Sequence, residues 1–403
     1  MRIGMFTDQY YPNISGVVTS IKMLYEGLES FGHEVFIFTS FDEKTVDNPD
    51  VLEKLNVINL PGRPYPFKDL KNYRWNLFHK KFIKQVASYQ LDVIHLHTEF
   101  NVGKIARMVA KKLNIPIVHT FHTLYEDYLK YVSPFFDQHF HDKMLSVLAK
   151  MFIRPISDMA VVKIVPTKKV LSVLDRYYIS GDVRVIPTGI PLERFYKKNF
   201  TQQQIVELKT KLNIPQDTFV FGYIGRTSGE KNIETIIRAY SRLSNRGKTV
   251  LLIVGGGPEL EDLKEYAKQY GVENDMIFTG FIEWEHIPLY YQVCDIFINA
   301  SKSETQGLTY IEALASSIPV LVQKDECIED VIQDYYNGIF FDGEFELTQK
   351  MEEIQKAPST LKKIKANTQK SVAKFSKEQY AMNVESVYKD AIVIYNESKQ
   401  KGR

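Results

Sequence analysis

One pattern recurs along most of this 403-residue chain: a short apolar run, then a longer amphipathic stretch, then another apolar run. In the first half the apolar runs are RIGMFT at 2–7, HEVFIFT, LDVIHLHTE, IPIVHTFHT, AVVKIVPT and VRVIPTG. The first two are separated by residues at helical spacing, namely Val17, Ile21, Leu24 and Leu28. Strands that alternate with helices in this way predict a parallel sheet covered on both faces. The pattern therefore predicts an α/β fold.

The alternation begins a second time after a polar, helix-favouring stretch at 196–215. The new apolar runs are FVFGYIGR, TVLLIVGGG, DIFINAS, PVLVQ and GIFFD. We predict two doubly wound α/β domains, at 1–195 and 216–375, with 196–215 as the linker region. A last helix near Lys377–Lys399 follows the final strand, and we expect 376–403 to brace the first domain. Ligands of open α/β sheets bind beyond the carboxyl ends of the strands, so the site is expected between the domains.

Composition and chain chemistry exclude several classes of protein. The chain is 44% hydrophobic, which excludes a disordered or fibrous protein. No apolar run reaches the roughly 18 residues that span a bilayer, and MRIGMFTDQY is not a signal peptide. The two cysteines, Cys294 and Cys327, cannot form a disulfide framework and fit a reducing compartment. We expect a globular protein of the cytoplasm.

Positive charge is concentrated in the first half of the chain. The range 63–112 holds 11 basic and three acidic residues, which implies an anionic partner surface. Within it, Phe67–Val86 carries six basic side chains and one acid among apolar residues, as in an amphipathic helix that lies in an anionic membrane interface. The candidate membrane-binding residues are Lys68, Lys71, Arg74, Trp75, Lys80, Lys81 and Lys84.

Two other interpretations of this basic stretch stay open. The helix could pack on the sheet and leave its basic face in solvent. A nucleic-acid surface is less favoured, because no recognised binding motif accompanies the charge.

Two acidic residues follow the run DIFINAS, in Glu304-Thr-Gln-Gly-Leu-Thr-Tyr-Ile-Glu312. A helix that begins near Gln306 would leave Glu304 in the loop and place Glu312 inside the helix. The helix N-terminus would then direct backbone N–H groups toward a phosphate. Glu312 could accept hydrogen bonds from a ribose diol. The alternative is a capping acid and a solvated helix face.

Two cations follow the run FVFGYIGR, in Gly225-Arg226-Thr-Ser-Gly-Glu-Lys231-Asn232. Arg226 and Lys231 could hold a diphosphate and neutralise the charge that develops on it as it leaves. The alternative is an ordinary surface loop. The later GGGPE at 255–259 lacks dinucleotide-binding spacing, and we interpret it as a turn.

The first domain carries a glycine and a group of histidines near strand ends. Gly16 opens the first helix, where a missing side chain lets backbone approach a phosphate. Four histidines end two neighbouring strands, but no metal-binding spacing accompanies them, so we expect no metal site. Of His95, His97, His119 and His122, His122 lies at a strand tip, where site residues belong.

Taken together, these motifs resemble the retaining glycosyltransferases of family 4, which have the GT-B fold. The likeness rests on Ser15-Gly16-Val17, Gly32-His33-Glu34-Val35, TFHT at 120–123, IPTGI at 186–190, and the two loops that carry Arg226–Lys231 and Glu304–Glu312. It implies two Rossmann-like domains that face each other across a cleft. The chain departs from the family at Ser317, where glycine is usual, and at Pro191, where aspartate is common.

The resemblance also implies roles for particular residues. Arg226 and Lys231 would bind the donor diphosphate, and Gly16 would pack against it. Glu312 would hold the nucleotide ribose, and Glu304 would contact the donor sugar together with the backbone of Gly307 and Leu308. His122 would accept a hydrogen bond from a sugar hydroxyl. We expect no required cofactor beyond the nucleotide sugar, although Mg²⁺ could stimulate activity.

Within the family, FTDQYYPNISGVVTSI and HTFHTLYEDYLKYV resemble bacterial diacylglycerol α-glucosyltransferases. This implies transfer of glucose from UDP-glucose to diacylglycerol at the cytoplasmic membrane face. The expected partners are the nucleotide sugar, diacylglycerol and anionic lipids, with no nucleic acid and no obligate protein partner. A soluble or polysaccharide-precursor acceptor, a sugar-nucleotide epimerase and a non-catalytic GT-B partner protein remain alternatives.

Overall fold

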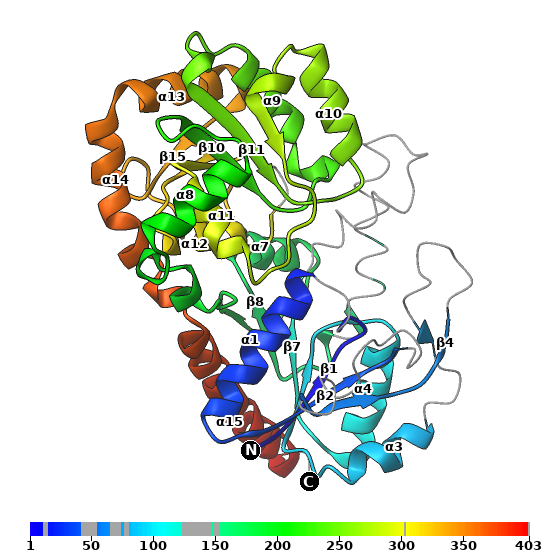
Figure 1. Ribbon diagram of the computed structural model, residues 1–403. Helices are drawn as coiled ribbons and strands as arrows, with labels where there is room; N and C mark the ends of the chain where they lie inside the picture. Colours follow the sequence, from blue (N-terminus) through cyan, green and yellow to red (C-terminus); the bar gives the residue numbers. More distant parts are fainter. Residues whose placement is uncertain are drawn as a thin grey trace. The chain divides into compact units, whose positions relative to one another are not determined.

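The protein is represented by a computed structural model, which describes residues 1–10, 15–41, 55–64, 74–75, 80–122, 147, 151, 154–155, 157–301 and 304–401. It divides into two compact units (Figure 1). Unit 1 contains Met1–Gly189 and Lys377–Arg403, and unit 2 contains Ile190–Ser376. The chain therefore passes from unit 1 to unit 2 after Gly189. The stretch 196–215, expected as a linker, belongs to unit 2, because Ile205 and Leu208 are buried in that unit's core.

Unit 1 is built on a seven-stranded sheet in which all described neighbours run parallel, as the alternation predicted. In spatial order the strands are β3 (Val57–Asn59), β2 (Glu34–Thr39), β1 (Arg2–Phe6), β6 (Val93–Leu96), β7 (Ile117–Thr120), β8 (Val162–Val165) and β9 (Asp182–Val185). Strand order reverses between β1 and β6. The first strand shows why both faces are covered, because Met5 and Phe6 are both fully buried, in different apolar clusters.

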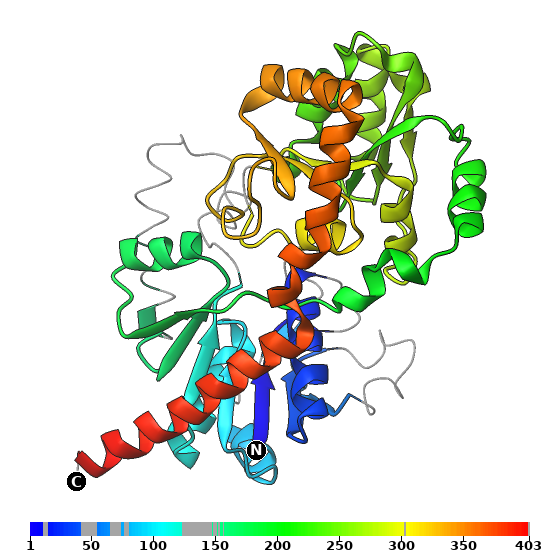
Figure 2. The ribbon, with the colours of Figure 1, turned by 90° about the vertical axis from the view of Figure 1, so that its left-hand side faces the viewer.

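Helices cover both faces of this sheet. They are α1 (Gly16–Ser30), α3 (Lys80–Ala87), α4 (Asn101–Leu113), α7 (Lys168–Arg176) and α15 (Lys377–Lys401). Buried residues of α1 and α15 share one cluster, and those of α3 and α4 share another. The C-terminal helix α15 runs beside α1 (Figure 2). A Cβ on Gly27 of α1 would lie 2.5 Å from the Ala381 Cβ. The final helix is thus an integral part of unit 1.

Unit 2 contains a six-stranded parallel sheet. In spatial order its strands are β12 (Met276–Phe278), β11 (Thr249–Val254), β10 (Phe219–Ile224), β13 (Ile296–Asn299), β14 (Val320–Gln323) and β15 (Gly338–Phe341). Order reverses between β10 and β13, the first strand of the unit and the fourth. This is the doubly wound arrangement predicted from the second series of apolar runs.

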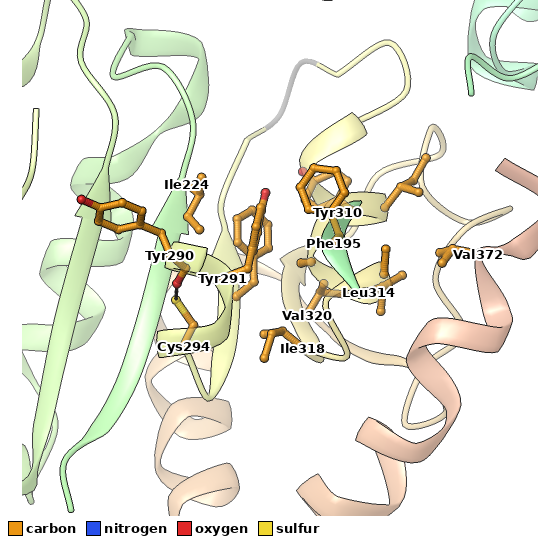
Figure 3. Close-up of a cluster of buried hydrophobic side chains, with 14 of the residues drawn as sticks. Phe195, Ile224, Tyr290, Tyr291, Cys294, Tyr310, Leu314, Ile318, Val320 and Val372 are labelled. Carbon is orange, nitrogen blue, oxygen red and sulfur yellow. Dashed lines mark hydrogen bonds between the residues drawn. The ribbon is translucent and has the colours of Figure 1, made fainter. Parts of the chain in front are cut away.

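Two apolar clusters fill the two faces of the unit 2 sheet. The helices are α8 (Gln202–Lys211), α9 (Ile233–Ser241), α10 (Leu260–Gln269), α11 (Ile287–Val293), α12 (Leu308–Ala315), α13 (Gly343–Lys356) and α14 (Pro358–Ser371). The cluster that includes α11 and α12 is rich in aromatic side chains, among them Phe195, Tyr291 and Tyr310 (Figure 3). Across the described residues of both units, no helix is long and apolar enough to cross a membrane.

The basic stretch Phe67–Val86 differs from the single helix that we expected. Arg74–Trp75 forms a short strand, β5, that pairs antiparallel with β4 (Arg63–Pro64), and α3 begins only at Lys80. The apolar side of α3 is also occupied, since Phe82 and Val86 are buried in the core of unit 1. Over its described part, the basic helix therefore packs on the fold and presents charge rather than an apolar face.

The described members of the candidate membrane-binding set accordingly divide into two groups. Lys80, Lys81 and Lys84 are exposed on α3, while Arg74 and Trp75 are half-buried in β5. Lys68 and Lys71 lie outside the described residues.

Helix α12 ends in a Schellman motif. The Ser317 N–H donates to the Leu314 carbonyl at 3.1 Å, and the Ile318 N–H donates to the Ala313 carbonyl at 2.9 Å. Ser317 closes this motif with φ of 63°, in the left-handed region where a Cβ is unfavourable. The glycine that is usual in the family would adopt this backbone without strain.

We predict that Ser317→Gly stabilises unit 2. Relief of the left-handed strain should exceed the extra chain entropy of glycine and contribute about 1 kcal/mol, or a rise of about 3 °C in the unfolding midpoint. Differential scanning calorimetry would measure it. Ser317→Ala is the matched control, since alanine keeps the Cβ and should show no such gain. An equal rise for both variants would contradict the strain explanation.

Candidate active site

The strand order of unit 2 determines where a ligand can bind. In doubly wound sheets the crevice lies beyond the carboxyl ends of the strands at which the order reverses. In unit 2 these strands are β10 and β13. The loop after β10 carries Arg226 and Lys231, and the loop after β13 carries Glu304. The two loops singled out from the sequence therefore flank the expected position.

Close backbone packing holds the loop after β10 in place. Gly225 donates its N–H to the Val254 carbonyl, and Thr227 donates to the Gly256 carbonyl, so the loops after β10 and β11 interlock. A Cβ on Gly255 would lie 1.9 Å from the Gly225 carbonyl oxygen, which no side chain could tolerate. The glycine run at 255–257 thus permits contact between two loops, in agreement with its interpretation as a turn.

Lys231 and Glu304 are brought together by these loops. The Lys231 Nζ donates to the Glu304 Oε1 at 2.6 Å, and the two side chains are 20% and 13% exposed. An ammonium carries three N–H donors, so this bond leaves two for a ligand. Lys231 ends the short 3₁₀ segment Gly229–Lys231, and only Asn232 separates it from α9. The pair therefore presents a cation that is fixed from both loops.

Arg226 lies in the same loop but is exposed. Among the residues that the structure describes, its guanidinium forms no ion pair. Only its backbone carbonyl is engaged, and it accepts a hydrogen bond from the buried Tyr223 hydroxyl at 2.8 Å. Arg226 thus adds an unneutralised positive charge to the loop that carries Lys231, as anion binding requires.

The N-terminus of α12 has a glycine where only a glycine fits. Gly307 adopts φ of 70°, and a Cβ there would lie 2.2 Å from ring atoms of Tyr310. The helix begins at Leu308, two residues later than expected from the sequence. Glu304 consequently lies in the loop, as predicted, and Glu312 lies just over one turn into the helix.

Glu312 is nearly enclosed, with 9% exposure. Its Oε2 accepts a hydrogen bond from the Tyr291 hydroxyl at 2.9 Å, while Oε1 accepts none from the described residues and is not shut off from solvent. Burial raises the pKa of Glu312 to about 7, against smaller lowering effects from Tyr291 and the nearby Arg194. One carboxylate oxygen is therefore oriented by the protein and the other is left for a ligand.

Sequence reasoning missed both Tyr291 and Arg194. Tyr291 lies on α11 among other buried aromatic residues, and nothing in its spacing separates it from a core tyrosine. Arg194 stacks on the Trp284 ring, with its guanidinium carbon 3.7 Å from the ring centroid, a contact that joins segments 90 residues apart. Only the tertiary structure brings these residues to Glu312.

In unit 1, Gly16 is the first residue of α1. The preceding Ser15 caps the helix by accepting the Val18 N–H at 3.3 Å. A Cβ on Gly16 would meet no atom within 4 Å, so the packing of the described residues does not require glycine here. The glycine leaves the helix N-terminus unobstructed, which suits a close approach by a ligand.

The four histidines form a buried layer near the ends of β6 and β7. His95 is a satisfied core residue, bonded to the Tyr388 hydroxyl at 2.6 Å and the Thr120 hydroxyl at 2.7 Å. His119 contacts Glu99 at 2.9 Å, and His97 contacts His122 at 2.9 Å. His122, the one expected to be functional, is the only member of the layer that is not fully buried. Within the described residues, no group of three or more potential ligands is arranged to hold a metal ion.

Asp8 is a further buried acid that the sequence did not reveal. It follows β1, at the strand reversal of unit 1, and accepts hydrogen bonds from the Thr98 hydroxyl and the Val102 N–H. Desolvation raises the pKa of Asp8 to about 6 despite these bonds. Because both oxygens bond within the fold, we assign Asp8 to the attachment of α4 rather than to ligand binding.

The chain matches two family models in succession. The model described as Glycosyltransferase Family 4 covers residues 14–194, and the model described as Glycosyl transferases group 1 covers residues 204–371. Together they span both units.

Full-length relatives agree with these matches. The chain is 38% identical, over all of both chains, to an α-monoglucosyldiacylglycerol synthase of Acholeplasma laidlawii. It is 36% identical to a Streptococcus pneumoniae protein of the same name, over 99% of this chain and 88% of that protein. Among solved structures, Anabaena HepE in complex with UDP and glucose has a TM-score of 0.74 at 18% identity, covering 97% of this chain and 100% of the other.

The fold and these matches define a glycosyltransferase with the GT-B fold. The chain belongs to glycosyltransferase family 4, among relatives that are hexosyltransferases. The family, the fold and the enzyme class expected from the sequence are therefore confirmed.

We predict that Glu312 makes unit 2 less stable as the pH rises. Its pKa is about 7 in the folded protein and 4.5 in the unfolded chain, so between these values the unfolded state binds fewer protons. The wild type should lose about 3 kcal/mol of unfolding free energy across this interval, and Glu312→Gln should not. Urea unfolding at a series of pH values, monitored by Trp284 fluorescence in a Trp75→Phe background, measures this loss of unfolding free energy.

Glu397→Gln, on the exposed end of α15, is the control and should retain the pH dependence of the wild type. Parallel profiles for the wild type and Glu312→Gln would show that the buried carboxyl does not ionise in this interval.

Proposed function

We propose that the protein transfers glucose from UDP-glucose to the 3-hydroxyl of diacylglycerol, with retention of configuration, to give an α-glycosyl-diacylglycerol. Two full-length relatives carry the name of a synthase of this product. Anabaena HepE, which has the same fold, binds UDP and glucose. The observation that carries the proposal is the pairing of Lys231 with Glu304 beside the exposed Arg226, at the strand reversal of unit 2.

The chemistry requires charge stabilisation more than it requires a reactive side chain. Overall, the acceptor hydroxyl oxygen forms a bond to the sugar C1, the bond from C1 to the phosphate oxygen breaks, and the hydroxyl proton passes to the leaving diphosphate. Negative charge then grows on the leaving diphosphate, and Arg226 and Lys231 neutralise it. We therefore propose that no fixed metal ion is needed at the diphosphate. Glu304 orients Lys231 and, with the backbone of Gly307 and Leu308, contacts the sugar.

The remaining contacts orient the donor. Glu312 accepts the ribose hydroxyls through Oε1, because Tyr291 already occupies Oε2. As the family resemblance implies, we propose that the sugar contacts His122 and that the diphosphate contacts the N-terminus of α1 at Gly16. Binding energy from these groups fixes the donor without taking part in bond cleavage.

The experiment that tests this function is a screen of UDP-glucose and UDP-galactose against diacylglycerol and soluble sugars. We expect a glycolipid from UDP-glucose and diacylglycerol. Arg226→Ala and Lys231→Ala should each lower kcat by about a hundredfold, since loss of one such contact typically costs about 3 kcal/mol. Lys211→Ala, at an exposed lysine of unit 2, is the matched control.

Other outcomes of the screen would identify a different protein. Transfer only to a soluble sugar would favour a polysaccharide-precursor acceptor. Conversion of the donor without a glycoside would indicate an epimerase, and no reaction at all would indicate a non-catalytic partner. Full activity in the double variant of Arg226 and Lys231 would refute the diphosphate site.

We further propose that the enzyme binds the cytoplasmic membrane face peripherally, through the basic residues around α3. Lys80, Lys81 and Lys84 are exposed together while the apolar side of the helix is buried. Attraction to anionic lipids would therefore be electrostatic, at about 1 kcal/mol for each lysine near the surface.

We predict that reversal of Lys80, Lys81 and Lys84 to glutamate weakens binding to anionic vesicles by at least about a hundredfold. Vesicle sedimentation at increasing salt and anionic lipid content measures it. UDP affinity should be unchanged, and activity on detergent-dispersed diacylglycerol should survive. The matched control reverses Lys211, Lys362 and Lys363, three exposed lysines of unit 2, for the same change in net charge. Equal release by both triple variants would point to net charge rather than to this surface.

A further inference from the structure

The hydrogen bond between His97 and His122 joins a buried side chain to the histidine that we predict to be functional. The His97 Nδ1 lies 2.9 Å from the His122 Nε2, and the two ring planes are only 21° apart. The second nitrogen of His97, Nε2, is buried and has no hydrogen-bond partner in the part of the chain that the structure describes. The second nitrogen of His122, Nδ1, has no partner among the described residues and is not shut off from solvent. His122 can therefore offer only Nδ1 to a ligand.

Near neutral pH, neither imidazole ring carries a charge. Desolvation holds the pKa of His97 well below its usual value, and together with the nearby His119 it lowers the pKa of His122 to about 3. A neutral imidazole has one N–H and one lone pair. The bond between the two rings must therefore have one donor and one acceptor, and the choice fixes the tautomer of both rings.

The two possible arrangements differ in what they leave unpaired on His97. If His122 donates, His97 must carry its proton on Nε2, and a buried N–H is left without a partner. If His97 donates from Nδ1, only a lone pair is left unpaired. Buried N–H groups without a partner are much rarer than under-satisfied acceptors. The second arrangement is therefore the favoured one.

We infer that His97 is a positioning residue that holds His122 as the Nδ1–H tautomer. In this form His122 donates a hydrogen bond to the bound nucleotide sugar. The part of this inference that concerns the nucleotide sugar rests on the proposed function, in which His122 contacts the sugar. It reverses the expectation from the sequence that His122 accepts a bond from a sugar hydroxyl. The hydrogen bond that His122 accepts at Nε2 places its proton on Nδ1, and functional histidines commonly have their tautomer fixed in this way.

The tautomer can be measured in the ligand-free protein, independently of any activity. Long-range ¹H–¹⁵N correlation spectra of histidine-labelled protein distinguish a protonated ring nitrogen from an unprotonated one. We expect Nδ1 of His122 to be protonated. A protonated Nε2 on His122 would overturn the inference, whatever the protein proves to catalyse.

Variants at His97 test whether that residue sets the tautomer. His97→Leu removes the donor, and His122 should then revert to the Nε2–H form that free histidine prefers. His97→Asn places an amide N–H near the former Nδ1 and should restore the Nδ1–H form. His119→Gln, which keeps a donor for Glu99, is the matched control and should leave His122 unchanged. An unchanged tautomer in His97→Leu would contradict the positioning role.

Donor analogues test the direction of the bond to the sugar. Fluorine can accept a weak hydrogen bond but cannot donate one, so a fluoro sugar and a deoxy sugar differ only if the protein donates. Calorimetry with UDP-hexoses altered at each hydroxyl in turn should find one position where the fluoro analogue binds up to about tenfold tighter than the deoxy analogue. That preference should vanish in His97→Leu and return in His97→Asn.

Equal affinities of the fluoro and deoxy analogues at every position would overturn the donor part of the inference. Failure of UDP-glucose to bind would instead reject the proposed function and leave the tautomer result standing.

Discussion

The ion pair between Lys231 and Glu304 joins the two loops at which the sheet of unit 2 reverses its strand order. Both side chains are less than a quarter exposed, so removal of either one would leave a largely buried charge without its partner, which is destabilising. The pair holds a lysine at the carboxyl end of the sheet with two N–H donors still free. Arg226 adds a second positive charge nearby. In our proposal, anion binding and stabilisation of the leaving diphosphate follow from this arrangement.

The backbone around the pair leaves little freedom. Gly255 allows the loop after β11 to press against Gly225, and Gly307 allows the turn before α12 to pack under the ring of Tyr310. These close approaches fix the loop after β10 and the start of α12, the two segments that carry the diphosphate and sugar contacts in our proposal. In unit 1 the layer of histidines plays a comparable part, because His122 is held by the buried His97 rather than by solvent.

Much of the fold could be predicted from the sequence, because the alternation of apolar strands with amphipathic helices is strongly periodic. The position of the loops that carry Arg226, Lys231 and Glu304 followed directly, since they come after recognisable strands. The tertiary partners could not be predicted in this way. Tyr291 reaches Glu312 from a separate helix, and nothing in its local sequence marks it.

The basic stretch before β6 shows a second limit. Its composition predicts an amphipathic helix, but composition does not determine whether the apolar side faces lipid or the protein's own core. The burial of Phe82 and Val86 answers this for α3 in favour of the core. Likewise, the sequence placed His122 at a strand tip, but its tautomer depends on a buried neighbour 25 residues away.

The most direct test of the account is the configuration of the first product. Proton NMR of the first-formed glycolipid from UDP-glucose and diacylglycerol reports the anomeric configuration at the sugar C1. The account predicts an α-glycoside from the α-linked donor. A β-glycoside would contradict a retaining transfer in this site.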